Sequence, residues 1–229
     1  MILVISNLAD ESASDLVRMF PAGTAGLVTA SDIHRSFIAR ISVGDFASSE
    51  IVVGGIRTTA GAVSGVISTI PYFLPQEFFY IDPVDREYVC SEISAFFIYF
   101  LSQLSCKKLN PPSTRRISGL GTHPIEWLQV ANGCGVPIWP VHLKNGTSLP
   151  AGDAQGLQPT RSTIIGNAMP DKIKEYMRAL SRAFAMPYLS GLFVSRDGGD
   201  YFLADLASVP DASVPEHRAA MVRFLKSPQ

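Results

Sequence analysis

The chain has 229 residues and a formal net charge of −1, from 19 lysines and arginines against 20 aspartates and glutamates. This length suits one large or two small domains, and it allows a buried core without disulfides or metals. Hydrophobic residues make up 47% and charged residues 17%, which excludes general disorder. The balanced charge argues against a nucleic-acid partner, because neutralising phosphates needs a surplus of lysine and arginine.

The sequence gives no indication of export or of a membrane partner. The start, Met1 to Ile5, has no basic residue, and its apolar run stops at Asn7. The apolar stretch 93–104 is too short to span a bilayer. The 3 cysteines form no C-x-x-C pair, so neither a disulfide framework nor a zinc site is indicated. We therefore expect a cytoplasmic protein.

Residues 2–70 alternate between short apolar runs and short helical or loop segments. A helix capped by Asp10 is expected from about Glu11 and ends before Pro21. The expected strands are 2–6, 24–29, 37–43, 51–53 and 65–70. Strands separated by short helices and loops are typical of a small open α/β sheet.

Helices and one hairpin are expected in the remainder. Asp82 as N-cap and Pro83 at the first position predict a helix that runs to about Ser105. The segment 144–166 is rich in Gly, Pro, Ser, Thr and Gln and predicts a long loop. Two apolar runs within 189–206 flank an Arg-Asp-Gly-Gly turn and predict a β-hairpin. Further helices are expected from near Thr122, from Pro170 and from Pro215.

No complete catalytic motif is present. The sequence lacks a P-loop, a G-x-S-x-G elbow and H-E-x-x-H, and Gly119-Leu-Gly121 is only a broken dinucleotide motif. A polar cluster, however, follows the predicted strand 24–29; its candidate ligand-binding residues are Ser31, Asp32, His34 and Arg35. Ligands in open α/β sheets bind outside the carboxyl ends of the strands. A small-molecule site here is one interpretation, and an ordinary loop is the other.

Asp205 is the candidate metal ligand. It lies in the apolar run Tyr201-Phe-Leu-Ala-Asp-Leu206, and strand alternation places it on the face of Tyr201 and Leu203. Hard cations take oxygen ligands, so a carboxylate in this strand suits Mg²⁺. The alternative is a solvated aspartate at an edge.

Four segments after residue 80 share their order with a known enzyme family. They are Asp82–Tyr88, Leu109-Asn-Pro-Pro112, Thr122-His-Pro124 through Gly135-Val-Pro137, and Asp197-Gly198 with Tyr201-Phe-Leu203. This series resembles the ATP-grasp superfamily, in particular the RimK-like ligases that modify ribosomal peptides. The resemblance implies an α/β fold that is α+β in its C-terminal part. A pre-ATP-grasp-like open sheet would occupy 1–109, and a reduced ATP-grasp-like domain 110–229.

The departures from the family pattern concern its nucleotide site. In ATP-grasp ligases ATP lies between two α+β subdomains, lysines bind the phosphates, and carboxylates with an asparagine hold magnesium. Here His123 stands at the lysine of the family's N-K-P motif. The segment 144–166 stands where the glycine-rich central subdomain would follow, and Leu203-Ala-Asp-Leu-Ala207 replaces the metal motif L-E-V-N-P.

Three functional hypotheses follow. The first is a truncated, degenerate ATP-grasp-like protein without ligase activity. It would be a binding, scaffold or regulatory partner in peptide or small-molecule modification, without ATP or Mg²⁺. Its partners would be a second copy, a full-length ATP-grasp enzyme, or a peptide. The second is a minimal ATP-dependent carboxylate–amine ligase, in which Asp205 holds Mg²⁺ and His123, Lys144 or Arg161 contacts phosphate. The third is a small-molecule-binding α/β protein that uses the cluster at Ser31.

Overall fold

The computed structural model describes residues 1–121, 123–139, 158–163, 170–196 and 200–227. The chain forms two compact units: residues 1–121 with 209–229, and residues 122–208. These units do not follow the expected division into 1–109 and 110–229. The chain leaves the first unit after residue 121 and returns to it at residue 209, because the last helix packs against the first sheet.

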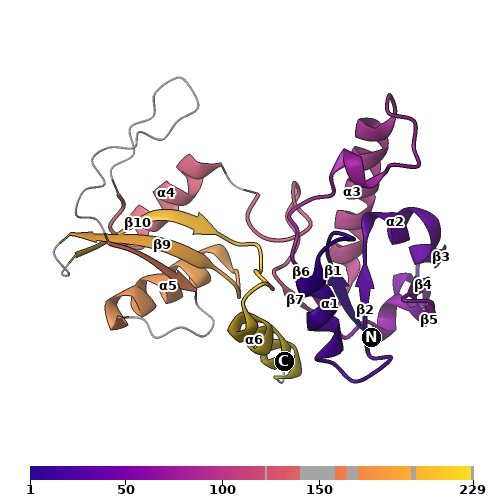
Figure 1. Ribbon diagram of the computed structural model, residues 1–229, viewed down its shortest axis with the longest axis horizontal. Coiled ribbons are helices and arrows are strands. Elements are labelled where there is room, and N and C mark those ends of the chain that lie inside the picture. Colours follow the sequence, from indigo (N-terminus) through magenta and orange to yellow (C-terminus); the bar gives the residue numbers. More distant parts are fainter. Residues whose placement is uncertain (122, 140–157, 164–169, 197–199, 228–229) are drawn as a thin grey trace. The chain divides into compact units, whose positions relative to one another are not determined.

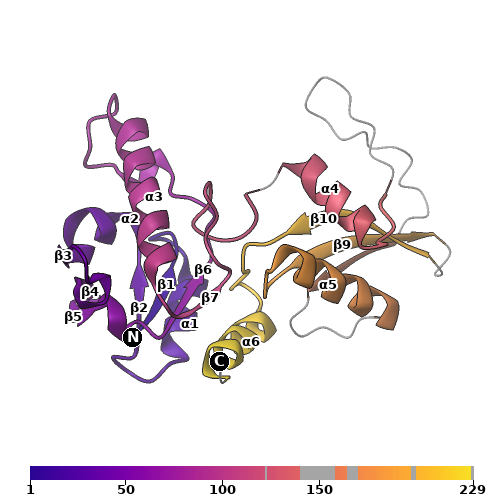
Figure 2. The same cartoon turned by 180° about the vertical axis from the view of Figure 1, so that it is seen from behind.

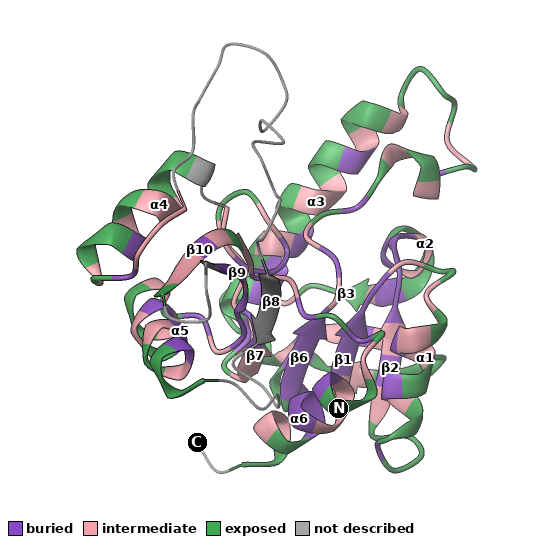
Figure 3. Cartoon of the chain, turned by 60° about the vertical axis from the view of Figure 1, so that its left-hand side comes forward, coloured by how far each residue is buried: buried purple, intermediate pink, exposed green. Residues whose placement is uncertain are grey.

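The first unit is built on a four-stranded parallel sheet (Figure 1). Its strands, in spatial order, are β2 (Ala25–Val28), β1 (Ile2–Ile5), β6 (Gly65–Ser68) and β7 (Lys107–Leu109). Leu3, Val4 and Ile5 are fully buried in β1, so both faces of the sheet are covered, as parallel sheets require. Figure 3 shows the same burial along β1 and β6. The sequence did not indicate β7, because two of its three residues are lysines.

Helices cover the two faces of this sheet. Figures 1 and 2 show α3 (Arg86–Gln103) on one face and α1 (Glu11–Arg18) on the other. Phe97 and Phe100 of α3 belong to the same core cluster as residues of β1 and β6. On the opposite side of β6, a Cβ built on Gly65 would lie 2.9 Å from Leu225 of α6 (Pro215–Lys226). Glycine at position 65 therefore allows α6 to approach the strand closely.

A small antiparallel sheet extends the first unit. After α2 (Ala30–Asp32) and a π-helical turn, Ile33–Phe37, it consists of β3 (Ile38–Arg40), β4 (Glu50–Val53) and β5 (Ile56–Thr59). Short 3-10 turns span Phe46–Ser48, Ala60–Ala62 and Pro75–Glu77. The predicted strand 37–43 is wrong in its length, since Val43 is 98% exposed and no apolar partner covers it. Phe37 is buried instead by edge-on contacts with Phe97 and Phe100.

The start of α3 corrects another expectation. The helix begins at Arg86, with Asp85 at its N-cap, rather than at Asp82. The Asp82 carboxylate accepts the N–H of Val84 at 3.0 Å, which closes a local turn. Aspartate side chains stabilise such turns as readily as helix starts, so the Asp-Pro signal marked the turn before the helix. Phe96, at an apolar position of this helix, is 38% exposed.

The second unit is a three-stranded antiparallel sheet with two helices. Its elements are α4 (Pro124–Gly133), β8 (Gln158–Thr163), α5 (Asp171–Phe184), β9 (Ser190–Arg196) and β10 (Asp200–Ala207), and the strand order is β10-β9-β8. A Cβ on Gly191 of β9 would lie 2.9 Å from the sulfur of Met177, which places α5 directly on the sheet. The hairpin β9–β10 and the start of α5 confirm the sequence prediction.

Part of the predicted loop 144–166 is a strand. Residues 158–163 form β8 and pair with β9 in antiparallel register. Residues 144–157 and 164–166 lie outside the described residues. The expected mixed fold, with parallel strands first and α+β structure later, is confirmed. None of the described helices has the length and apolar character needed to cross a membrane.

Candidate functional site

Hydroxyl and carboxyl groups gather where β1 and β6 end. The Ser6 hydroxyl donates to the Asp10 carboxylate at 2.6 Å, and the Thr69 hydroxyl donates to Ser6 at 2.7 Å. The other Asp10 oxygen accepts the N–H of Ala13 at 3.2 Å, which makes Asp10 the N-cap of α1. The predicted cap is thus confirmed, and hydrogen bonds from the Ser6 and Thr69 hydroxyls hold the Asp10 carboxylate in place.

The strand order makes this edge of the sheet a natural ligand position. The chain leaves β1 toward β2 on one side, and it leaves β6 toward β7 on the other. Ligands of open α/β sheets bind at such a switch in direction. A cavity of about 270 Å³ lies here, lined by Asp10, Ser12, Thr69 and residues 209–213.

A second cavity, of about 290 Å³, lies at the carboxyl ends of β1 and β2. Residues 7–9 follow β1 and form one wall, and residues 29–31 follow β2 and form another. The third wall is contributed by Leu74, Glu77 and Phe79. We call this space, defined by these three walls, the β1/β2 cavity.

The predicted ligand-binding cluster reaches this cavity through one member. Ser31 lines it. The Asp32 carboxylate accepts the backbone N–H of Thr29 at 2.9 Å and its hydroxyl at 2.7 Å, so it is engaged in a capping box. The rings of His34 and Tyr80 lie 4.6 Å apart, and the guanidinium of Arg35 lies 4.9 Å from the centre of the same Tyr80 ring. A ligand-binding role for the four residues remains a prediction.

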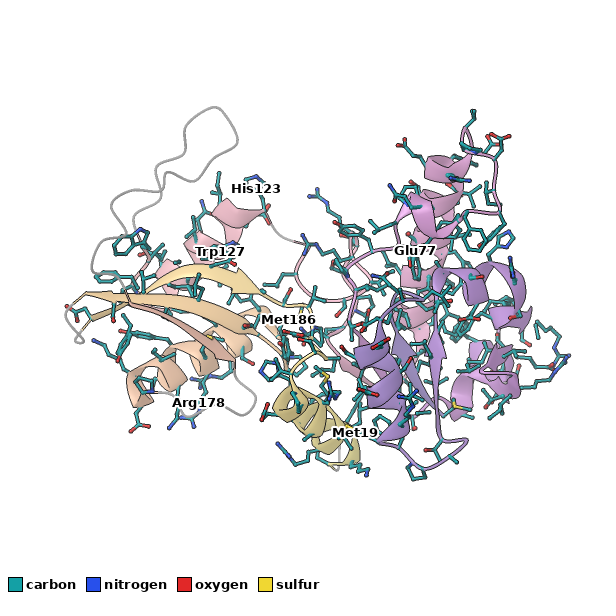
Figure 4. The ribbon with its side chains drawn as sticks, in the orientation of Figure 1. Met19, Glu77, His123, Trp127, Arg178 and Met186 are labelled. Atoms are coloured by element: carbon teal, nitrogen blue, oxygen red, sulfur yellow. The ribbon has the colours of Figure 1, made fainter. Side chains whose placement is uncertain are left out.

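Glu77 lies in the third wall and was missed by sequence reasoning. Its carboxylate accepts the N–H of Leu74 at 2.8 Å (Figure 4). Burial raises the pKa of Glu77, and the hydrogen bond from Leu74 opposes that rise. Glu77 lies three residues after Leu74, the N-cap of the 3-10 turn, which is the spacing of the glutamate in a capping box and the signal that marks this residue in the sequence.

His123 has a structural role at the start of α4, where Figure 4 labels it. Its Nδ1 accepts the N–H of Ile125 at 3.3 Å, and the Glu126 carboxylate accepts the N–H of His123 at 3.2 Å. These two bonds form a capping box, which satisfies N–H groups that the first helical turn leaves without partners. The predicted phosphate contact of His123 is not tested by this arrangement.

Asp205 does not share a face with Leu203, which corrects the alternation expected from the sequence. The register of β10 shifts between these two residues: Leu203 pairs with Phe193, but Asp205 pairs with Leu192. This bulge leaves Asp205 exposed while Leu203 is fully buried. The Asp205 carboxylate accepts the N–H of Leu206 at 2.9 Å.

The structure describes less of the other two predicted nucleotide-binding residues, Lys144 and Arg161. Lys144 lies outside the described residues. The backbone of Arg161 pairs with Leu192 in the sheet, and its side chain lies outside the described part. Among the described residues, no three His, Cys, Asp or Glu side chains are grouped so that they could hold a metal ion.

Comparison with solved structures identifies the fold. The chain is similar to macrocyclase MdnC of Microcystis aeruginosa MRC bound with precursor peptide MdnA, with a TM-score of 0.74, 15% identity, and coverage of 99% of this chain and 100% of that one. Macrocyclase MdnB of the same organism matches with a TM-score of 0.68, 12% identity and 99% coverage of both chains. A RiPP-associated ATP-grasp ligase of Chryseobacterium gregarium, in complex with ADP and a leader and core peptide, has a TM-score of 0.68, 11% identity, and coverage of 100% and 97%.

The chain therefore has the fold of ATP-grasp ligases. This confirms the fold that the resemblance implied, over almost the whole chain. No protein-family profile and no curated protein sequence matches. The matches cover 100%, 99% and 97% of these three structures. They do not test the expected loss of a central subdomain, which remains a prediction.

Proposed function

We propose that this chain is a non-catalytic, peptide-binding partner in a cytoplasmic peptide-modification pathway. The observation that carries the proposal is the whole-chain likeness to a macrocyclase bound with its precursor peptide. A second neighbour was crystallised with a leader and core peptide. The partners of this chain would then be a peptide and a full-length ATP-grasp enzyme, and neither ATP nor Mg²⁺ would be required.

Two described residues support the non-catalytic part of the proposal. His123, at the position of the family's lysine, already accepts a backbone N–H as a helix cap. Asp205 stands exposed at a bulge, and the described residues give it no second and third acidic or histidine partner. Binding of Mg²⁺ with a nucleotide needs several oxygen ligands together with cationic contacts to the phosphates.

Nucleotide binding is the first test. We expect the unfolding temperature of the full chain to be the same with and without millimolar Mg-ATP. A ligand that binds only the folded state adds about 2.7 kcal/mol at a hundredfold excess over its dissociation constant, which is readily measured. A rise that disappears in Asp205→Ala, but persists in the exposed control Asp200→Ala, would favour the minimal ligase instead.

Peptide binding is the second test. Where a short reading frame lies next to this gene, the probe is a labelled synthetic copy of the peptide that it encodes, followed by fluorescence anisotropy. We expect saturable binding and an unchanged peptide mass after incubation with Mg-ATP. Loss of water from the peptide would show that a bond has formed and would establish the ligase alternative. Absence of saturable binding would contradict the proposal.

A further inference from the structure

We propose that the β1/β2 cavity binds an apolar amine, that is, an apolar group about the size of an aromatic side chain that carries a primary ammonium. This site is separate from the nucleotide and metal residues considered above. The inference does not depend on the proposed peptide-binding function. It rests on the size of the cavity, the apolar side chains around it, and the charge of the groups in its walls.

The cavity has the size and lining of a small-molecule site. Its volume of about 290 Å³ exceeds the roughly 150 Å³ of an apolar cavity known to admit benzene. Leu8, Leu74 and Phe79, which line it, are exposed by 67%, 42% and 59% respectively. Large apolar side chains gathered around a hollow, with a few polar groups among them, are typical of ligand sites.

The charged residues in the walls of the cavity determine which polar group of a ligand is favoured. Glu77 is the acidic residue of the walls, and within the described part of the chain neither lysine nor arginine lines the cavity. One Glu77 oxygen accepts the N–H of Leu74, and the described residues offer no donor to the other. The nearby cations are engaged elsewhere: Arg35 lies over Tyr80, and Arg86 donates to the carbonyl of Phe79. Among the described residues, the half-buried carboxylate therefore has no cationic partner.

A second acceptor lies in the same walls. The side-chain oxygen of Asn7 is shielded from solvent and accepts no hydrogen bond from the described residues. An ammonium group offers three donors and no acceptor, so it complements an amide oxygen and a carboxylate together. A ligand carboxylate would instead meet two acceptors and a like charge. The walls thus favour an amine over an acid of the same shape.

The binding test uses phenethylamine and its acidic counterpart, 3-phenylpropionate. We expect phenethylamine to give saturable shifts in the ¹H–¹⁵N NMR spectrum of the full chain, centred on residues 7–9, 29–31 and 74–79. We expect 3-phenylpropionate to give none. Equal binding of the acid, shifts centred elsewhere, or no saturable shift with phenethylamine would overturn the proposal.

Two kinds of variant test separately how the charge and the shape of the cavity contribute to binding. Glu77→Gln should weaken phenethylamine binding about tenfold or more, whereas Glu87→Gln, on the exposed face of α3, should leave it unchanged. Ala9→Phe fills the cavity from an exposed position and should abolish binding even if Glu77→Gln fails to fold. Wild-type affinity in Glu77→Gln or in Ala9→Phe would contradict the assignment.

A further pair of probes identifies the source of the amine. The tripeptide amide Phe-Gly-Gly presents the same aromatic group and ammonium as a peptide N-terminus, and its N-acetyl form removes the charge. Tighter binding of the free tripeptide than of phenethylamine would assign the site to peptide N-termini. Tighter binding of phenethylamine would assign it to free amines. Equal binding of the acetylated and free peptides would overturn the requirement for an ammonium.

Discussion

The two units bury their sheets in different ways, and this difference determines where their candidate sites lie. The first unit covers both faces of a parallel sheet, and two of its cavities lie at the carboxyl ends of the strands. The second unit packs α5 against an antiparallel sheet, and its candidate metal residue stands exposed at a bulge. A parallel sheet concentrates polar loop residues at one edge, whereas an antiparallel hairpin distributes them along its length.

The largest expected effect is the loss of a core aromatic in the first unit. Phe97 is fully buried and contacts the rings of Phe37, Phe73 and Phe100. We expect Phe97→Ala to cost about 3–5 kcal/mol of unfolding free energy. Circular dichroism in urea follows both units, whereas the 2 tryptophans, Trp127 and Trp139, report only on the second. For Phe97→Ala, we expect the urea midpoint measured by dichroism to fall and the midpoint measured by tryptophan fluorescence to stay unchanged. A fall of both midpoints would show that the two units unfold together.

The next effect concerns close packing in the second unit. A Cβ at Gly191 would lie 2.8 Å from the ring of Phe193 and 2.9 Å from the sulfur of Met177. We expect Gly191→Ala to cost about 1–3 kcal/mol, because both neighbours must shift. The matched control is Gly133→Ala at the end of α4, where nothing lies within 4 Å. Tryptophan fluorescence in urea measures both variants; an equal midpoint for the two would refute the close approach of α5.

Two helix caps allow a direct comparison of the units. Asp10 caps α1 and also accepts the hydroxyl of Ser6, whereas His123 caps α4 from an exposed position. We expect Asp10→Ala to cost about 1–2 kcal/mol and His123→Ala about 0.5 kcal/mol. Asp10→Asn, which keeps an acceptor, should recover part of the loss. Urea unfolding measures all three variants; equal losses in Asp10→Ala and His123→Ala would show that the network around Asp10 contributes nothing.

The smallest effect is a pH dependence confined to the first unit. Because burial raises the pKa of Glu77 in the folded chain, the folded state holds this proton more tightly than the unfolded state. Stability should therefore rise as the pH falls through the raised pKa toward the ordinary value of 4.5. Burial also raises the pKa of the neighbouring Cys90, whose thiol stays protonated over this range. The urea midpoint, followed by circular dichroism, should depend on pH more steeply in the wild type than in Glu77→Gln. Equal pH dependence of the two midpoints would exclude Glu77 as the cause.

The sequence predicted those parts of the fold where local and tertiary preferences agree. Asp10 before an amphipathic helix, and two apolar runs around a Gly-Gly turn, occur as expected because nothing competes with them. Asp82 was misleading because the same side chain stabilises a turn. The strands β7 and β8 were missed because their residues are polar, and pairing with apolar neighbours decides their structure.

The candidate sites were harder to predict than the elements. Ser31 could be placed at the end of a strand from the sequence, but Glu77 enters the same cavity from a segment 46 residues later. A bulge determines the face of the sheet on which Asp205 lies, and the alternation of residues in the sequence does not predict a bulge. Contacts between distant segments and irregular register are therefore the information that a single sequence lacks.

The return of the chain to its first unit at residue 209 has a consequence for biosynthesis. A Cβ built on Gly65 would lie nearest to Leu225 of α6, and Lys107 donates hydrogen bonds to the carbonyl and hydroxyl of Ser227. On the ribosome, the first sheet emerges long before the helix that closes it. The residues of the second unit are therefore synthesised before α6, and one side of β6 lacks its helix until residues 215–226 have emerged.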